Sequence, residues 1–215
     1  MTAPSISDLP PVNQLALAYA PARARGATQA LLALDARLAA VLRKRREVVL
    51  VQVRLAWWRD LLAQPAAQWP TGDAVLDGLA NWHVPAALVP LVDGWEALLA
   101  EDLLPGMIAQ FADGRGLAFA ALAQRLGAPD PDAASQAARI WALADLAANL
   151  SDAAERQLVI DYWRTLPPPP RLPASLRALA VLAALGRRAL ERGGGPLLAG
   201  PQSVLLALRT GLLGR

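Results

Sequence analysis

The chain has 215 residues, of which 55% are hydrophobic and 18% charged, and its formal net charge is +3. A chain of this length can bury a sizeable core as one domain, and so high a hydrophobic fraction argues against disorder. The small net charge gives no indication of nucleic-acid binding, and the lack of cysteine excludes disulfides and thiolate chemistry. Alanine and leucine, both strong helix formers, dominate the sequence, which therefore predicts an all-α, single-domain helical bundle.

No targeting segment is expected at the start of the chain. The stretch MTAPSISDLPPVNQ lacks a basic segment followed by an apolar one, as a signal peptide would need. The longest uncharged run, Gly193 to Leu208, is interrupted by prolines and glycines and would not span a bilayer as one helix. We therefore expect a cytoplasmic protein and leave contact with a membrane surface open.

The N-terminal part of the chain divides at its prolines. Residues 1–13 are expected to form an irregular arm, and Gln14–Ala20 a short helix that ends at Pro21. From Thr28 to Arg46, leucines recur at the i, i+3 and i+4 positions of one helix face, which predicts a helix.

The next segment, EVVLVQVRLAWWRDLL, is ambiguous. Its β-branched first half favours a strand by propensity. However, Val51, Leu55, Trp58 and Leu62 keep a helical spacing through the whole segment, and the chain offers no second strand to pair with it. An unpaired strand would leave its backbone groups unsatisfied, so we predict a helix.

Further helices are expected along the rest of the chain, separated by breaks at GRG, GAPDPD and LPPPPRLP. Their approximate bounds are Ala74–Asn81, Pro85–Leu98, Glu101–Asp113, Leu117–Leu126, Asp132–Leu150, Ala153–Arg164 and Leu172–Arg192. An aspartate near Pro131 is expected to cap the helix that follows. Residues 14–192 would form the helical domain, and residues 193–215 a loosely attached tail with a short amphipathic helix.

One cluster of aromatic and charged residues stands out, formed by Arg54, Trp57, Trp58, Arg59 and Asp60. In one interpretation a tryptophan packs in the core while the charges connect neighbouring helices. In the other the cluster is a patch that faces a lipid or a partner, because adjacent residues cannot both point at the same core.

For the other charged residues, a structural role is the first interpretation and a binding role the alternative. The basic run Arg43–Arg46 predicts a solvated helix end, although it could hold a diphosphate or an anionic lipid headgroup. His83, the only histidine, is expected to be structural. Asp93 and Glu96 share a helix face, but no second acid-rich helix completes a metal site with them.

The order of these pieces resembles the squalene/phytoene synthase family, an all-α fold of the isoprenoid-synthase type. The matching segments are LALAYAPARARGATQALLALDARLAAV, VRLAWWRDLL and AARIWALADLAANLSDAAER. RLAWWRD is especially similar to a divergent bacterial branch, which also includes a mitochondrial complex I assembly factor. The resemblance covers roughly residues 14–192.

Catalytic members of this family hold magnesium ions with two aspartate-rich helices, since Mg²⁺ prefers carboxylate and diphosphate oxygens. The resemblance places the first set of acids at Ala39, Ala40 and Arg43, and the second at Asn149 and Ala153. Both motifs are thus degraded. Asp35, Asp145 and Asp152 are the nearest acids, but their spacing does not match the motifs.

The resemblance therefore implies a non-catalytic protein that binds an isoprenoid-type lipid in an apolar tunnel, or a protein client during assembly of a membrane complex. Arg43, Arg54, Trp57, Trp58 and Arg59 are its candidate ligand- or partner-binding residues. No metal or cofactor is expected.

Two alternatives remain. One is an active prenyl-diphosphate transferase that uses Mg²⁺ in a rearranged site formed by Asp35, Asp145 and Asp152. The other is a structural bundle that forms a homodimer through its tryptophan-bearing face.

Overall fold

The computed structural model describes residues 9–43, 48–82, 84–168 and 171–214. Ten α-helices and no strand occur in these ranges, so the predicted all-α, single-domain bundle is confirmed. The helices are α1 (Pro11–Ala18), α2 (Ala22–Leu42), α3 (Val48–Ala63), α4 (Ala74–Leu79), α5 (Val89–Ala97), α6 (Pro105–Arg125), α7 (Pro131–Asn149), α8 (Ala153–Arg164), α9 (Arg177–Glu191) and α10 (Pro201–Leu213).

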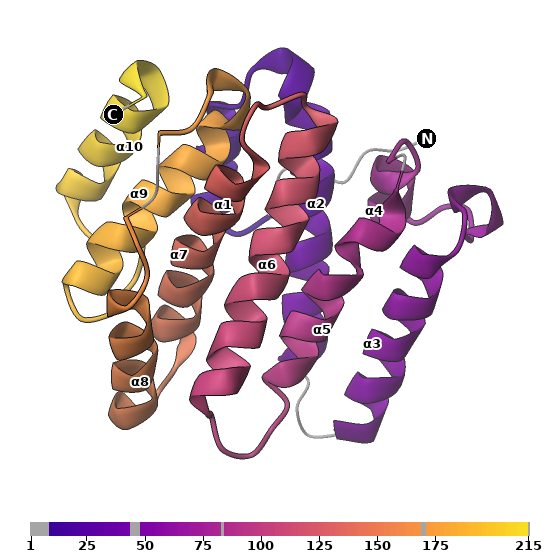
Figure 1. Ribbon diagram of the computed structural model, residues 1–215, viewed down its shortest axis with the longest axis horizontal. Coiled ribbons are helices and arrows are strands. Elements are labelled where there is room, and N and C mark those ends of the chain that lie inside the picture. Colours follow the sequence, from indigo (N-terminus) through magenta and orange to yellow (C-terminus); the bar gives the residue numbers. More distant parts are fainter. Residues whose placement is uncertain (1–8, 44–47, 83, 169–170, 215) are drawn as a thin grey trace.

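Six of the helices lie side by side in the order α10, α9, α7, α6, α5, α3 (Figure 1), and each contacts the next. Helices α1 and α2 pack behind this row, where α1 contacts α9 and α2 contacts α5 and α6. The two ends of the row, α3 and α10, are the opposite ends of the molecule's longest axis.

The centre of the bundle is packed with small side chains. Ala134, Ala137, Ala144 and Ala147 of α7 are completely buried, and α7 lies between α6 and α9. Small side chains let neighbouring helix backbones approach closely, and interiors at native density leave few voids. The alanine-rich composition thus produces a tightly packed interior layer.

The glycines of GRG do not end a helix, which corrects the break predicted there. Gly114, Arg115 and Gly116 lie within the continuous helix α6. A Cβ atom on Gly114 would lie 2.2 Å from the carbonyl oxygen of Pro90, and one on Gly116 would lie 2.7 Å from Ser135 Oγ. The glycines are needed for the close approach of α5 and α7 to the two sides of α6.

Helices α1 and α10 differ from the irregular arm and the loose tail expected near the two ends of the chain. Helix α1 begins at Pro11, which suits the first helical position because it lacks an N–H, so the predicted arm of residues 1–13 is too long. Helix α10 packs on α9 and α1 and buries Ala207 completely. The Ser203 hydroxyl also donates to Ala199 O at 2.7 Å, so the tail is attached more firmly than we expected.

Several local predictions are confirmed. The ambiguous segment is helix α3, and α8 has the predicted bounds Ala153–Arg164. The carboxylate of Asp130 accepts a hydrogen bond from Ala133 N and caps α7. Across the described ranges, none of the helices has both the length and the apolar character needed to cross a membrane.

Candidate functional site

A buried arginine joins two aspartates at the centre of the bundle. Arg115 of α6 donates from Nε to Asp35 Oδ1 at 3.1 Å and from Nη2 to Asp35 Oδ2 at 2.9 Å. The same Nη2 donates to Asp145 Oδ2 of α7 at 3.0 Å. A guanidinium that binds a carboxylate through two parallel bonds is held in one orientation. Helices α2, α6 and α7 are therefore joined by one charged network.

Three aromatic rings enclose the guanidinium of Arg115. Its Cζ lies 4.1 Å from the ring centre of Trp141, 4.9 Å from that of Phe111 and 5.3 Å from that of Trp95. The rings attract the cation through their negative faces, most strongly where water is excluded. Trp95 Nε1 also donates to Asp35 Oδ1 at 3.0 Å. The aromatic residues thus support both the base and its main acid.

The protonation of this cluster is governed by burial. Burial raises the pKa of Asp35 above its ordinary value of 3.8, since a charged carboxylate is disfavoured away from water. The positive charge of Arg115 opposes this shift, the negative charge of Asp145 adds to it, and the hydrogen bonds from Trp95 and Arg115 oppose it. The side chain of Asp145 is 30% exposed and that of Asp35 is 5% exposed, and both acids line one cavity.

That cavity has a volume of about 470 Å³ and lies between α1, α2, α5, α6, α7 and the start of α8. Its walls are mainly aliphatic and aromatic, with Leu42, Leu98, Phe111, Trp141, Leu146 and Leu150 among the lining residues. Asp35, Asp145 and Glu155 are the acids that line it among the described residues.

Two buried polar atoms of lining side chains lack a hydrogen-bond partner within the described ranges. They are the acceptor Asn13 Oδ1 and the donor Trp141 Nε1. Buried polar groups nearly always have a partner, and leaving one unpaired costs about 1–3 kcal/mol. Both residues line the cavity, but these two atoms are enclosed by protein and not exposed on its surface.

The cavity includes positions that the family resemblance assigns to catalytic acids. Ala39, Arg43 and Asn149 line it, whereas Ala40 and Ala153 do not. Asn149 Nδ2 donates to the backbone carbonyl of Asp145 at 2.8 Å. These lining positions thus present a methyl group, a cation and an amide instead of carboxylates.

Asp152 does not belong to the cluster around Arg115. Its carboxylate caps α8 and accepts hydrogen bonds from Ala154 N at 2.7 Å and Glu155 N at 2.9 Å. A capping carboxylate satisfies backbone N–H groups that the helix itself leaves free. The structure therefore brings together Asp35 and Asp145 of the three candidate acids, and leaves Asp152 in a local structural role.

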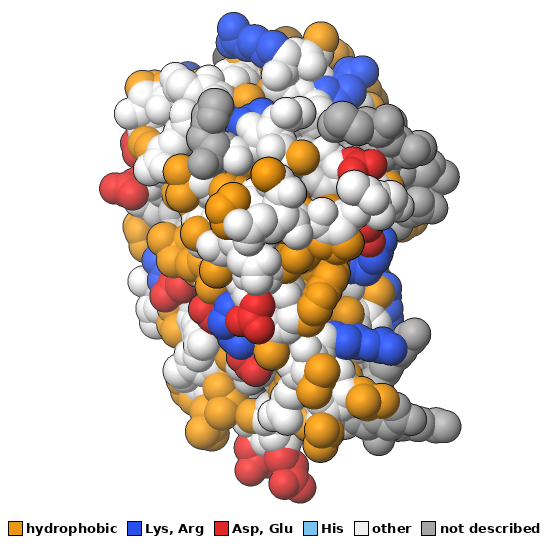
Figure 2. Space-filling view, turned by 90° about the vertical axis from the view of Figure 1, so that its right-hand side faces the viewer, with side chains coloured by type: hydrophobic (Ala, Val, Ile, Leu, Met, Phe, Trp, Pro, Cys, Tyr) orange, Lys and Arg blue, Asp and Glu red, His pale blue; other side chains and the backbone are white. Residues whose placement is uncertain are grey.

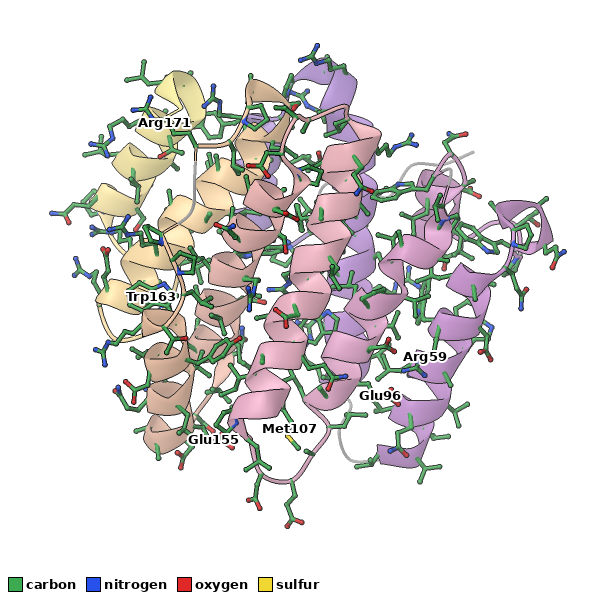
Figure 3. The ribbon with its side chains drawn as sticks, in the orientation of Figure 1. Arg59, Glu96, Met107, Glu155, Trp163 and Arg171 are labelled. Atoms are coloured by element: carbon green, nitrogen blue, oxygen red, sulfur yellow. The ribbon has the colours of Figure 1, made fainter. Side chains whose placement is uncertain are left out.

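The cluster of Arg54, Trp57, Trp58, Arg59 and Asp60 lies on α3, and none of these residues lines the cavity. Arg43, the remaining candidate binding residue, does line it. Trp58 is buried, while its neighbour Trp57 is 46% exposed and meets it edge to face at 5.0 Å. Arg54 is exposed. Arg59 forms ion pairs with Asp93 and Glu96 of α5, and Figure 3 shows Arg59 and Glu96 between these helices. The hydrogen bond that Arg59 donates to Asp93 raises the pKa of Arg59, burial opposes this shift, and the hydrogen bond to Glu96 adds to it.

The outer face of α3 carries a row of exposed apolar residues, visible as orange side chains in Figure 2. Val49, Val53 and Trp57 follow one another at intervals of one helical turn, and Leu50 lies beside them; all four are exposed. We call Val49, Val53 and Trp57 the α3 stripe. Lys44 to Arg46 of the basic run, and His83, lie outside the described residues.

Sequence reasoning missed Arg115, because its two glycine neighbours predicted a helix break. A usable signal was present. Phe111 and Phe119 lie four residues before and after Arg115, on the same helix face, and both are buried. A base in the middle of an apolar helix face needs a buried acid as partner.

No group of three or more metal-ligating side chains occurs in the part of the chain that the structure describes. Comparison with known proteins adds no relative, since no family model, no curated protein and no solved structure matches the chain.

Proposed function

We propose that this chain is a non-catalytic protein of the squalene/phytoene synthase type that holds an isoprenoid-type lipid in the cavity between α1, α2, α5, α6 and α7. The observation that carries the proposal is the ion-pair network of Arg115 with Asp35 and Asp145. The resemblance implies that catalytic relatives bind magnesium with aspartates at the motif positions, whereas here the nearest acids, Asp35 and Asp145, are neutralised by an internal guanidinium.

The carboxylates fit a magnesium site poorly. Mg²⁺ needs nearly octahedral oxygen ligands at about 2.0–2.1 Å. Both oxygens of Asp35 already accept from Arg115, and Oδ1 accepts from Trp95 as well. Asp152 caps a helix, which leaves Asp145 and Glu155 as acids at the cavity surface. The alternative of a rearranged transferase site is therefore less well supported than the lipid-binding role.

The cavity suits an uncharged lipid with a small polar head. Its volume of about 470 Å³ lies within the usual range of ligand pockets, and its walls are largely apolar. An isoprenoid alcohol or a quinone-like lipid meets both conditions, and we place the protein in the cytoplasm.

The test is calorimetric titration with farnesol, geranylgeraniol, a short-chain quinone, and farnesyl diphosphate with and without Mg²⁺. We expect an alcohol or the quinone to bind and Mg²⁺ to have no effect. Ala39→Phe should reduce binding at least tenfold by filling the cavity, whereas Ala40→Phe, on the next residue but outside the cavity lining, should not. Mg²⁺-dependent binding of farnesyl diphosphate with release of diphosphate would establish the transferase instead.

The α3 stripe favours a second candidate role, in which the protein is a scaffold that binds another protein. Exposed contiguous apolar residues on a helix commonly mark interaction sites. The family resemblance connects such a role with assembly of a membrane complex, by analogy alone. A homodimer through this face is the most directly testable form of the idea.

A further inference from the structure

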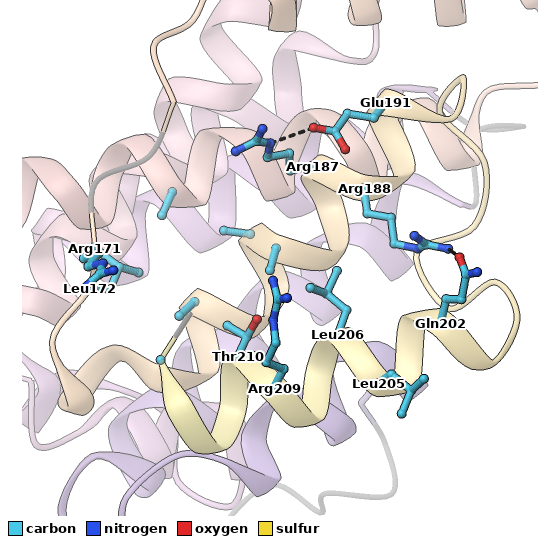
Figure 4. A pocket seen from close by; sticks show the side chains of 15 residues that line it. Arg171, Leu172, Arg187, Arg188, Glu191, Gln202, Leu205, Leu206, Arg209 and Thr210 are labelled. Atoms are coloured by element: carbon cyan, nitrogen blue, oxygen red, sulfur yellow. Dashed lines mark hydrogen bonds and ion pairs between the residues drawn. The ribbon is translucent and has the colours of Figure 1, made fainter.

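A second hollow, of about 770 Å³, lies between α9 and α10 at the end of the molecule opposite α3. Figure 4 shows Arg171 on the segment before α9, Arg187 and Arg188 on α9, and Arg209 reaching from α10 toward α9. Glu191 is the only acid among the residues that line the hollow. We call this hollow the arginine groove.

The arginine groove concentrates positive charge over an apolar floor. Four arginines and one glutamate line it, so its local formal charge is +3, the same as the net charge of the whole chain. Glu191 is engaged by Arg187 at 2.8 Å, and Arg188 donates to the neutral Gln202 at 2.7 Å. The floor is formed by Ala137, Ala180, Ala183 and Ala184. Guanidinium groups in this setting match a phosphate group in charge and in hydrogen-bond geometry.

The outer face of α10 adds a row of exposed apolar residues beside the arginine groove. Val204, Leu208 and Leu212 follow one another at intervals of one turn and are 49%, 40% and 70% exposed. We call these three residues the α10 stripe. Leu205 connects the two features, because it lines the groove and is exposed as well.

We propose that the α9–α10 end of the molecule docks on an anionic phospholipid surface, with a lipid phosphate in the arginine groove and acyl chains against the α10 stripe. An interfacial helix of this kind combines an apolar face with neighbouring cations. Each cation near an anionic leaflet adds to the affinity, and the effect is screened by salt. An acidic partner protein would match the groove but would not require the adjoining row of leucines.

The location of the two stripes supports α10 as the membrane-facing helix. Helices α3 and α10 are at opposite ends of the longest axis (Figure 1), so the two stripes can be tested separately. Within α3 itself the exposed Arg54 and Asp60 have opposite charges, whereas four arginines and one glutamate line the groove at α10. The basic run Arg43–Arg46 precedes α3 in the sequence, so this contrast in charge applies only to the described residues 48–63 of that end. The α3 stripe therefore provides a matched control for the α10 stripe.

The experiment is flotation of the full chain with vesicles of phosphatidylcholine alone or mixed with phosphatidylglycerol. We expect binding to the mixed vesicles only, and weaker binding in high salt. Arg171→Gln with Arg188→Gln should lower the partition coefficient about 25-fold, because each cation near the surface contributes about fivefold. Leu208→Gln with Leu212→Gln should lower it at least tenfold. Val49→Gln with Val53→Gln on α3 should leave it unchanged.

Several outcomes would overturn the proposal: no flotation, equal flotation with both vesicle types, or loss of binding in the α3 variant but not in the α10 variant. Displacement of the protein from vesicles by millimolar inorganic phosphate at constant ionic strength would instead identify a soluble anion as the ligand of the groove. Circular dichroism and thermal unfolding of every variant keep a folding defect separate from a binding defect.

Discussion

The side chain of Arg115 is almost completely buried, with 1% of its surface exposed. Its charge is tolerated because Asp35 and Asp145 supply opposite charges and three aromatic rings surround it. Removing one partner of a buried ion pair costs more than forming the pair gains, since the remaining charge is left unpaired in a medium of low dielectric constant.

Arg115→Met should therefore destabilise the fold strongly. The substitution leaves Asp35 without its main partner, and we expect the free energy of unfolding to fall by about 3–5 kcal/mol. Urea denaturation followed by tryptophan fluorescence measures this change. The control is Arg164→Met, which breaks an exposed ion pair with Asp161 and should cost less than about 1 kcal/mol. Equal, small losses in both variants would contradict the structural role of Arg115.

The raised pKa of Asp35 has a consequence for the pH dependence of stability. In the pH range above 3.8 and below the raised value, folded Asp35 keeps a proton that the unfolded chain has lost. The contribution of Asp35 to stability is thus fully present below its ordinary pKa and is lost as pH rises through the folded pKa. Because the charge of Asp145 raises this pKa, Asp145→Asn should lower it.

Carbon-13 NMR titration of the Asp35 carboxyl group in both proteins measures the effect of Asp145→Asn. A higher pKa of Asp35 in the variant than in the wild type would show that the sign of this interaction is wrong.

The sequence identified the two acids of the buried cluster but not the arginine that binds them. Asp35 and Asp145 were identified as the acids nearest the degraded motifs, and the structure brings them together. Arg115 is 80 residues from Asp35 and 30 from Asp145 in sequence. Such a contact depends on the packing of three helices, which local spacing does not encode.

Helix α6 runs unbroken through two glycines because its neighbours pack closely against them. Gly114 lies where the backbones of α5 and α6 cross, with room for a hydrogen atom but not for a methyl group. By local propensity, two glycines around one arginine predict a helix break. In the folded protein the same glycines are the positions where α5 and α7 contact α6. For α3 the opposite holds, because the helical spacing of its apolar residues overrides β propensity.

Gly114→Ala should separate α5 from α6. The added methyl group would lie 2.2 Å from Pro90 O, and backbone cannot move aside as a flexible side chain can. We expect a loss of about 1–3 kcal/mol in the free energy of unfolding. The control is Gly26→Ala within α2, where the methyl group meets no atom within 4 Å and should stabilise the helix by up to about 1 kcal/mol. Stabilisation in both variants would contradict the close contact.

On the scale of the whole molecule, the row of helices leaves two exposed apolar stripes, one at each end. The α10 stripe lies beside the arginine groove, whereas the described residues of α3 itself carry both signs of charge, with Arg54 and Asp60 exposed. The two ends are therefore suited to different partners. We expect a second copy of the chain to bind the α3 stripe, since a small Val49 and a large Trp57 stand at its two ends.

In an antiparallel pair with its twofold axis at Val53, the small Val49 of one copy lies opposite the large Trp57 of the other. The chain has no cysteine, so a substituted thiol reports only on this contact. We expect Val53→Cys to form a disulfide-linked dimer, since the two thiols meet at the axis. Val49→Cys should link efficiently only when mixed with Trp57→Cys. Equally fast linking of Leu208→Cys on α10 would show that collision, not docking through α3, produces the dimer.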